Sequence, residues 1–131
     1  KINKSKYFRQ IDKTQIFKAR NILRKDQLLV RLNEPRQDIL EKMDEAKVDV
    51  CYVVDDKNGY LGQLNRDKIA KSRMKTVEKF VVHIEPILRN TYLKDLWNRF
   101  ENYDENLPVV DSKGKFRGVL SKDDMISVLA S

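Results

Sequence analysis

The sequence predicts an α/β (α+β) fold made of two β-α-β-β-α repeats. The run Val53–Asp55 (Val-Val-Asp) recurs as Val109–Asp111, and Gly62 recurs as Gly118 at the same spacing of 56 positions. Self-similarity at a fixed spacing indicates a repeat architecture. In a chain of 131 residues, a half of about 50 residues has little core of its own. We therefore expect the two repeats to pack sheet to sheet with pseudo-twofold symmetry.

Local signals mark each element of the first copy. A short extended segment at 28–32 comes first, and apolar residues at helical spacing after Asn33 indicate a helix that this asparagine caps. A run rich in β-branched residues at 50–54 predicts a buried strand. An Asn-Gly turn then joins it to a second strand at 60–64, and Asn65 is placed to cap a final helix.

The second copy repeats this order with its own signals. The expected elements are an extended segment at 84–88, a helix capped by Asn90, strands at 107–110 and 116–120, and a helix from Ser121. In the first of these helices, the residues at core spacing are Leu93, Leu96, Trp97 and Phe100.

The basic residues are concentrated in two parts of the chain. Lys and Arg number 27 against 20 Asp and Glu, a net charge of +7, whereas residues 1–31 alone carry a net charge of +8. We divide the chain into a basic N-terminal linker at 1–21, a first repeat at 22–75 and a second repeat at 76–131. A further basic stretch runs from Arg66 to Lys79. Such segments attract nucleic acid, anionic lipid or nucleotide phosphates, although they also occur as ordinary solvated surface.

The sequence argues against catalysis by this chain. Its 4 glycines form no P-loop, and its 1 histidine has no second histidine with which to bind a metal. Cys51 lies in an apolar strand, which predicts a buried small hydrophobe rather than a nucleophile. A single cysteine forms no internal disulfide and fits a reducing cytoplasm. No apolar run is long enough for a membrane span, and no apolar stretch that would mark a signal peptide follows the basic start.

The repeated motifs carry a resemblance to a known family. The strand that ends in Asp, the hairpin, and the glycine followed three residues later by a helix cap all occur twice in register. Over residues 22–131 the two copies resemble CBS domains, and the pair resembles a Bateman module. The resemblance implies a non-enzymatic regulatory module that dimerises through its helices and requires no cofactor. AMP, ADP, ATP or cyclic di-AMP are the implied regulatory ligands.

The segment from Tyr7 to Phe17 resembles the stretch ahead of the CBS pair in ATP-binding subunits of glycine betaine/proline ABC importers. Since the chain starts at Lys1 without Met, we expect a fragment that forms the regulatory tail of such a subunit. The implied partners are its own ATPase domain and the transporter permease, at the inner face of the cell membrane. The basic N-terminal linker could then also contact the anionic membrane surface, in a way that ionic strength weakens.

The resemblance also implies a ligand site. Nucleotide-binding CBS repeats carry Gly-x-x-Ser/Thr-x-x-Asp, which the second copy matches with Gly118, Ser121 and Asp124. Gly118 would let a ligand approach, Ser121 would donate to a phosphate or ribose oxygen, and Asp124 would accept from the ribose hydroxyls. Adenine would lie between Ile87 and Val119. Ser-x-x-Asp also resembles a capping box, which closes a helix without any ligand.

The first copy departs from this pattern. Asn65 stands at the hydroxyl position and Lys68 stands where the carboxylate belongs. Lys68 cannot accept a hydrogen bond, so we expect one ribose-type site in the chain. Lys68 and Arg66 are weaker candidates for a phosphate contact.

Two alternatives remain open on the sequence alone. The same module could regulate another host protein, such as a channel or a dehydrogenase. A basic nucleic-acid-binding domain is less favoured, because aromatic residues lie among the N-terminal lysines but no reading motif accompanies them. We therefore expect no nucleic-acid partner.

Overall fold

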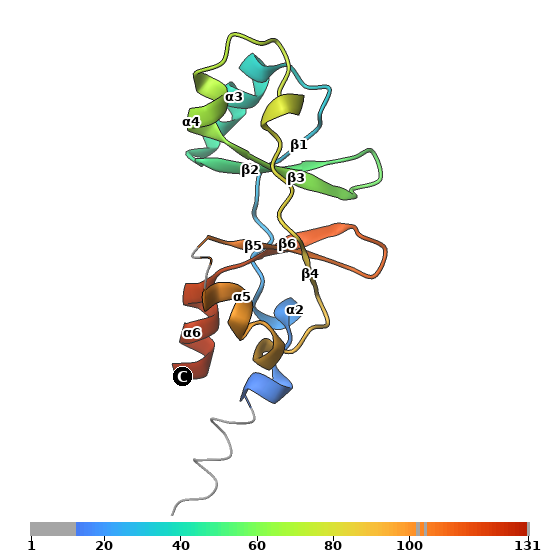
Figure 1. The fold of residues 1–131 in the computed structure, drawn as a ribbon, viewed down its shortest axis with the longest axis vertical. Coiled ribbons are helices and arrows are strands. Elements are labelled where there is room, and N and C mark those ends of the chain that lie inside the picture. The colour runs from blue at the N-terminus through green and yellow to red at the C-terminus, as the bar shows by residue number, and fades with distance from the viewer. Residues whose placement is uncertain (1–12, 102, 104, 131) are drawn as a thin grey trace, which may run out of the picture. The chain divides into compact units, whose positions relative to one another are not determined.

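The computed structural model describes residues 13–101, 103 and 105–130. It confirms the predicted class, with two three-stranded sheets of order β1-β2-β3 and β4-β5-β6 and helices beside each of them (Figure 1). The chain divides into two compact units. The first-sheet unit holds residues 26–85 and 113–116, and the second-sheet unit holds the described residues among 1–25, 86–112 and 117–131.

The sheet of the first-sheet unit has mixed strand directions. Strand β1 (Leu29–Val30) runs parallel to β2 (Val50–Val54), which pairs antiparallel with β3 (Tyr60–Asn65). Parallel neighbours need a crossover connection, and α3 (Arg36–Ala46) supplies it between β1 and β2. The hairpin from β2 to β3 was predicted from the sequence and is confirmed.

Helices α3 and α4 (Arg66–Ala70) lie on the same side of this sheet, as Figure 1 shows. Their apolar side chains and those of the strands form one core. Full burial of such a side chain contributes about 1.5–3 kcal/mol. Cys51 lies inside this core, as predicted, and burial raises the pKa of its thiol to about 12. The fully enclosed members of the core are Val30, Ile39, Met43, Cys51, Val53, Leu64, Ile69 and Val77.

The two helix starts of this unit match the sequence differently. Asn65 caps α4, because its side-chain oxygen accepts from the backbone N–H groups of Asp67 and Lys68. The cap predicted at Asn33 is wrong, since α3 begins after Pro35. Pro35 takes the N-cap position with an extended backbone, which its fixed φ allows, and its carbonyl accepts the Ile39 N–H at 3.1 Å.

The second-sheet unit repeats the arrangement. Its strands are β4 (Ile87–Leu88), parallel to β5 (Leu107–Val110), and β6 (Phe116–Leu120). The helices are α2 (Ala19–Ile22), η2 (Leu93–Asp95, a 3-10 turn), α5 (Trp97–Glu101) and α6 (Lys122–Ala130). Contacts join α2 to α6.

Two expectations for the second repeat are wrong. The segment predicted as one helix after Asn90 forms the 3-10 turn η2 followed by α5, with Tyr92 preceding the turn. Leu93 and Leu96 are buried as expected, and a spacing of three residues places them on one face in either geometry. Trp97, for which the helical spacing predicts a place in the core, is 44% exposed.

Short extended segments add an edge to each sheet, and we call them straps. The β3 strap (Val81–Val82) pairs antiparallel with Gln63, and the β6 strap (Leu23–Arg24) pairs antiparallel with Val119. Each strap makes two backbone hydrogen bonds of 2.8–2.9 Å with its partner residue. The β6 strap lies at the start of the first repeat in the chain, yet it pairs with a strand of the second.

The start of β6 belongs to the first-sheet unit. Its Phe116 ring stacks on Tyr52 with 5.2 Å between centroids and lies 6.2 Å from Tyr60. Backbone hydrogen bonds join Tyr60 N–H to Gly114 and Phe116 N–H to Asn58. No helix among the described residues is both long and apolar enough to cross a membrane.

Candidate functional site

Gly118 has a strap directly against it. Its φ of +147° is one that side chains rarely adopt, and a Cβ there would lie 2.3 Å from the Arg24 carbonyl oxygen and 2.7 Å from a Leu23 methyl carbon. Gly62 occupies the matching place, where a Cβ would lie 2.5 Å from Val81 and 2.8 Å from the Val82 oxygen. Both motif glycines are therefore needed for the close approach of the straps, independently of any ligand.

Ser121 stands at the start of α6. Its hydroxyl oxygen accepts the Asp124 backbone N–H at 3.0 Å, so the helix-capping interpretation of this motif is present in the structure. The hydroxyl of a serine has one proton to donate and two lone pairs. Accepting the cap hydrogen bond leaves that proton to donate, and the Asp124 carboxylate beside it is its acceptor.

Asp124 is engaged by a residue that sequence reasoning did not select. The Arg24 Nε donates to one carboxylate oxygen at 2.6 Å and the Arg24 Nη2 donates to the other at 2.9 Å. The side chains are 61% and 23% exposed, respectively. The hydrogen bond from Arg24 holds the pKa of Asp124 below its ordinary value, and the bond from Ser121 acts in the same direction.

The two residues expected to hold adenine are both interior. Ile87 in β4 is 3% exposed and Val119 in β6 is fully buried. Ile87 lies opposite Val109 of the central strand β5. The structure therefore brings all five candidates of the second repeat into one unit, with the polar ones at the end of β6 and the start of α6.

The phosphate candidates Arg66 and Lys68 belong to the first-sheet unit. The Arg66 Nε contacts an Asp44 carboxylate oxygen at 2.5 Å, and this hydrogen bond lowers the pKa of Asp44. The Lys68 side chain is exposed on α4, and its backbone N–H donates to Asn65. Arg66 is thus committed to a carboxylate, whereas the ammonium of Lys68 faces solvent.

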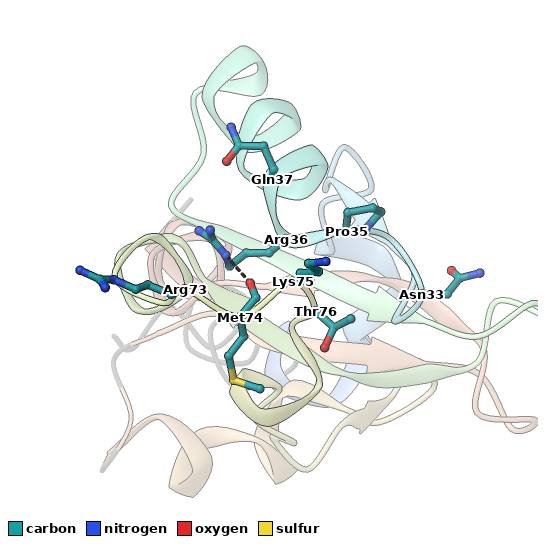
Figure 2. A pocket seen from close by; sticks show the side chains of 8 residues that line it. All are labelled: Asn33, Pro35, Arg36, Gln37, Arg73, Met74, Lys75 and Thr76. Atoms are coloured by element: carbon teal, nitrogen blue, oxygen red, sulfur yellow. Dashed lines mark hydrogen bonds between the residues drawn. The ribbon is translucent and has the colours of Figure 1, made fainter.

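A cavity of about 340 Å³ lies at the start of α3 in the first-sheet unit (Figure 2). Figure 2 shows Arg36 reaching to the Met74 carbonyl, a hydrogen bond of 2.7 Å, while the guanidinium of Arg73 points outward. The cavity does not include Arg66 or Lys68. Its lining residues are Asn33, Pro35, Arg36, Gln37, Arg73, Met74, Lys75 and Thr76.

Among the described residues, no group of three or more His, Cys, Asp or Glu side chains is placed to hold a metal ion. The arrangement around Asp124 offers hydrogen-bond acceptors, a hydroxyl donor and one guanidinium. These groups are suited to binding a small polar molecule.

Comparison with known proteins places the chain in a family. The search of curated proteins found no match. The fold matches CbpB in complex with c-di-AMP, with a TM-score of 0.81 and 15% identity over 96% of this chain and 93% of that one. CBSX2 in complex with AMP matches with a TM-score of 0.71 and 22% identity, over 87% of this chain and 96% of that one.

Staphylococcus aureus OpuCA matches with a TM-score of 0.74 and 21% identity, over 84% of this chain and 97% of that one. Identities at this level show the shared fold alone. The family model "CBS domain" matches residues 19–75 and again residues 81–131. The chain therefore belongs to the CBS domain family and consists of a pair of CBS domains.

Proposed function

We propose that this CBS pair is a non-enzymatic regulatory module that binds an adenine nucleotide, either AMP, ADP, ATP or cyclic di-AMP, through Ser121 and Asp124. CBS pairs are regulatory modules, and chains of the same fold were solved with c-di-AMP and with AMP. The observation that carries the proposal is the contact between the Ser121 hydroxyl and the Asp124 carboxylate at the start of α6.

The charges at the start of α6 favour the ribose over the phosphate as the group held there. A helix N-terminus attracts anions, but the first turn of α6 already holds two carboxylates, Asp123 and Asp124. A phosphate would be repelled by both of them. A ribose instead offers two hydroxyl donors, which a carboxylate accepts well because it has two oxygens and about four lone-pair sites.

We further propose a single ribose site in the chain. Lys68 occupies the position in the first repeat that Asp124 occupies in the second. An ammonium donates but never accepts, so the ribose hydroxyls have no acceptor at Lys68. The exposed Lys68 ammonium is better suited to a phosphate, as a weaker contact.

The proposed host is the ATPase subunit of an osmoprotectant ABC importer for glycine betaine, carnitine or proline. The support is the resemblance of residues 7–17, most of which lie outside the described residues, and the fold match to OpuCA is compatible with it. In that setting the module would act in the cytoplasm at the membrane's inner face, as a homodimer attached to its ATPase domain and the permease. A ligand would regulate transport through its difference in affinity between two arrangements of the module.

The nucleotide proposal is tested by calorimetric titration of the chain with AMP, ADP, ATP and cyclic di-AMP. We expect one of the four to bind, and Asp124→Asn to lose most of that affinity. Asp56→Asn is the matched control, because Asp56 also pairs with an arginine but lies in the first-sheet unit. Binding that survives unchanged in Asp124→Asn would place the site elsewhere, and no binding of any of the four would refute the proposal.

The host proposal has its own test. The basic N-terminal linker predicts that the chain co-sediments with anionic lipid vesicles at low salt and is released as salt rises. Vesicles of neutral lipid are the control. Failure to bind anionic vesicles at low salt would remove the membrane from the proposal without affecting nucleotide binding.

A further inference from the structure

We propose that Arg24 and Asp124 form a salt-sensitive latch that occupies the ribose acceptor and that a nucleoside must open. This inference rests on the proposed function, because it concerns regulation of the same site. It assigns a role to Arg24, a residue of the β6 strap.

Both partners of the latch are held by the backbone around them. The β6 strap is fixed by two hydrogen bonds between Arg24 and Val119, of 2.8 and 2.9 Å. Asp124 is fixed on α6, where its N–H donates to Ser121. The guanidinium therefore meets the carboxylate as a two-pronged fork, with one hydrogen bond to each oxygen. This geometry gives the strongest ion pairs between arginine and carboxylates.

The fork competes with a ribose for the same atoms. Two neighbouring hydroxyls of a ribose would donate to the two oxygens of Asp124, as the two nitrogens of Arg24 do. A nucleoside that takes both oxygens in this way must therefore displace the guanidinium. The apparent affinity for the nucleoside is its intrinsic affinity multiplied by the fraction of molecules in which the latch is open.

Ionic strength acts directly on this competition. The Arg24 side chain is 61% exposed and Asp124 is 23% exposed, so dissolved ions reach the pair. Screening shortens the reach of such charges from about 8 Å at 0.15 M salt to about 3 Å at 1 M. Rising salt therefore opens the latch and frees Asp124. Ionic strength and nucleoside would then act on one pair of residues.

The first-sheet unit has a strap of its own without these two residues. Val82 pairs with Gln63 as Arg24 pairs with Val119, and Lys68 replaces Asp124. A valine and a lysine form no ion pair. The latch is thus confined to the second-sheet unit, which holds the proposed ribose acceptor.

Adenosine is the sharpest probe, because it carries the ribose without a phosphate charge. We compare its dissociation constant for the chain and for Arg24→Gln by calorimetry at 50 mM and 500 mM NaCl. A partly exposed pair of this kind shifts an equilibrium by up to about fivefold. We expect Arg24→Gln to bind adenosine up to about fivefold more tightly at 50 mM, and the difference to shrink at 500 mM. Arg31→Gln, which removes the Arg31–Asp56 pair, should leave the constant unchanged.

A second measurement tests the pair without any ligand. Urea unfolding of the chain, Arg24→Gln, Asp124→Asn and the double variant gives their coupling energy in a thermodynamic cycle. We expect favourable coupling at 50 mM NaCl that is weaker at 500 mM. Zero coupling at 50 mM would overturn the latch, whatever the titrations show.

The outcomes separate the latch from the proposed function. Equal adenosine affinity in the chain and Arg24→Gln at both salt concentrations overturns the latch and leaves nucleotide binding in place. Weaker binding by Arg24→Gln overturns it too, because Arg24 would then be a ligand contact. If neither protein binds adenosine or any of the four nucleotides, the proposed function itself fails, and the latch fails with it.

Discussion

Gly118→Ala should destabilise the fold strongly, because two costs coincide at this position. The added Cβ would lie 2.3 Å from the Arg24 carbonyl oxygen, closer than the 3.0 Å that real Cβ atoms respect, and the φ of +147° disfavours any side chain. Backbone strain costs about 1–3 kcal/mol, and overpacking costs a further 1–3 kcal/mol or so. We therefore expect a loss of roughly 2–6 kcal/mol in the free energy of unfolding.

Two further alanine substitutions separate these costs. Gly114 has a φ of +79° with nothing within 4 Å of an added Cβ, so Gly114→Ala tests strain without crowding. Gly62→Ala tests crowding alone. Its Cβ would lie 2.5 Å from a Val81 side-chain carbon, and Gly62 does not have a left-handed φ. We expect Gly118→Ala to cost more than either of the others.

Urea unfolding, monitored by circular dichroism, measures the free energy of unfolding of all three glycine variants. For a chain of this size, each kcal/mol lowers the melting temperature by roughly 4 °C, so Gly118→Ala should melt at least about 8 °C below the parent chain. A loss no larger than that of Gly114→Ala would show that the β6 strap does not pack on Gly118. The assignment of this glycine to the strap would then be wrong.

Three other measurements test separate parts of the fold. Phe116→Ala should lower the free energy of unfolding in urea by about 3–5 kcal/mol, because Phe116 is only 6% exposed. Leu88 is 55% exposed, so Leu88→Ala should change that free energy by under about 0.5 kcal/mol. The pKa of the Cys51 thiol is about 12, so on the order of one molecule in ten thousand carries a thiolate at pH 8. Iodoacetamide should therefore label Cys51 only in urea, and rapid labelling of the folded chain would contradict its burial. Hydrogen bonds, the largest contribution coming from the Gly59 N–H, lower the pKa of Asp55 in the folded state. The Asp55 carboxylate therefore stabilises the fold above about pH 4, and this stabilisation is lost as pH falls through the lowered pKa. Asp55→Asn should flatten the fall in stability below pH 4, and an unchanged acid profile would count against this carboxylate.

The sequence predicted the local elements well because their signals are local. The two hairpins and the caps at Asn65 and Ser121 each depend on a few consecutive residues. Asn33 is different, because asparagine suits both helix caps and turns. Here Asn33 lies in a turn, and helix α3 begins only after Pro35. Trp97 shows the limit of apolar spacing, which does not distinguish an enclosed helix face from one that is 44% exposed.

The straps could not be predicted in this way. Each pairs through a single residue, so it has none of the alternation that marks a strand. Arg24 also lies 100 positions before Asp124 in the chain, and nothing in the basic N-terminal stretch distinguishes it from its neighbours. The carboxylate and the hydroxyl of the candidate site were therefore predictable from a motif, whereas the cation that occupies the carboxylate was not.

The straps also change which motif residues carry information about a ligand. Gly62 and Gly118 both face a strap, so a glycine is required in each repeat whether or not that repeat binds anything. Specificity must come from positions where the repeats differ. Asp124 in one sheet unit corresponds to Lys68 in the other, and Arg24 corresponds to Val82. The unit that holds Asp124 also holds Arg24. Under the proposed function, one pair of side chains would therefore set both the affinity for ribose and its control by salt.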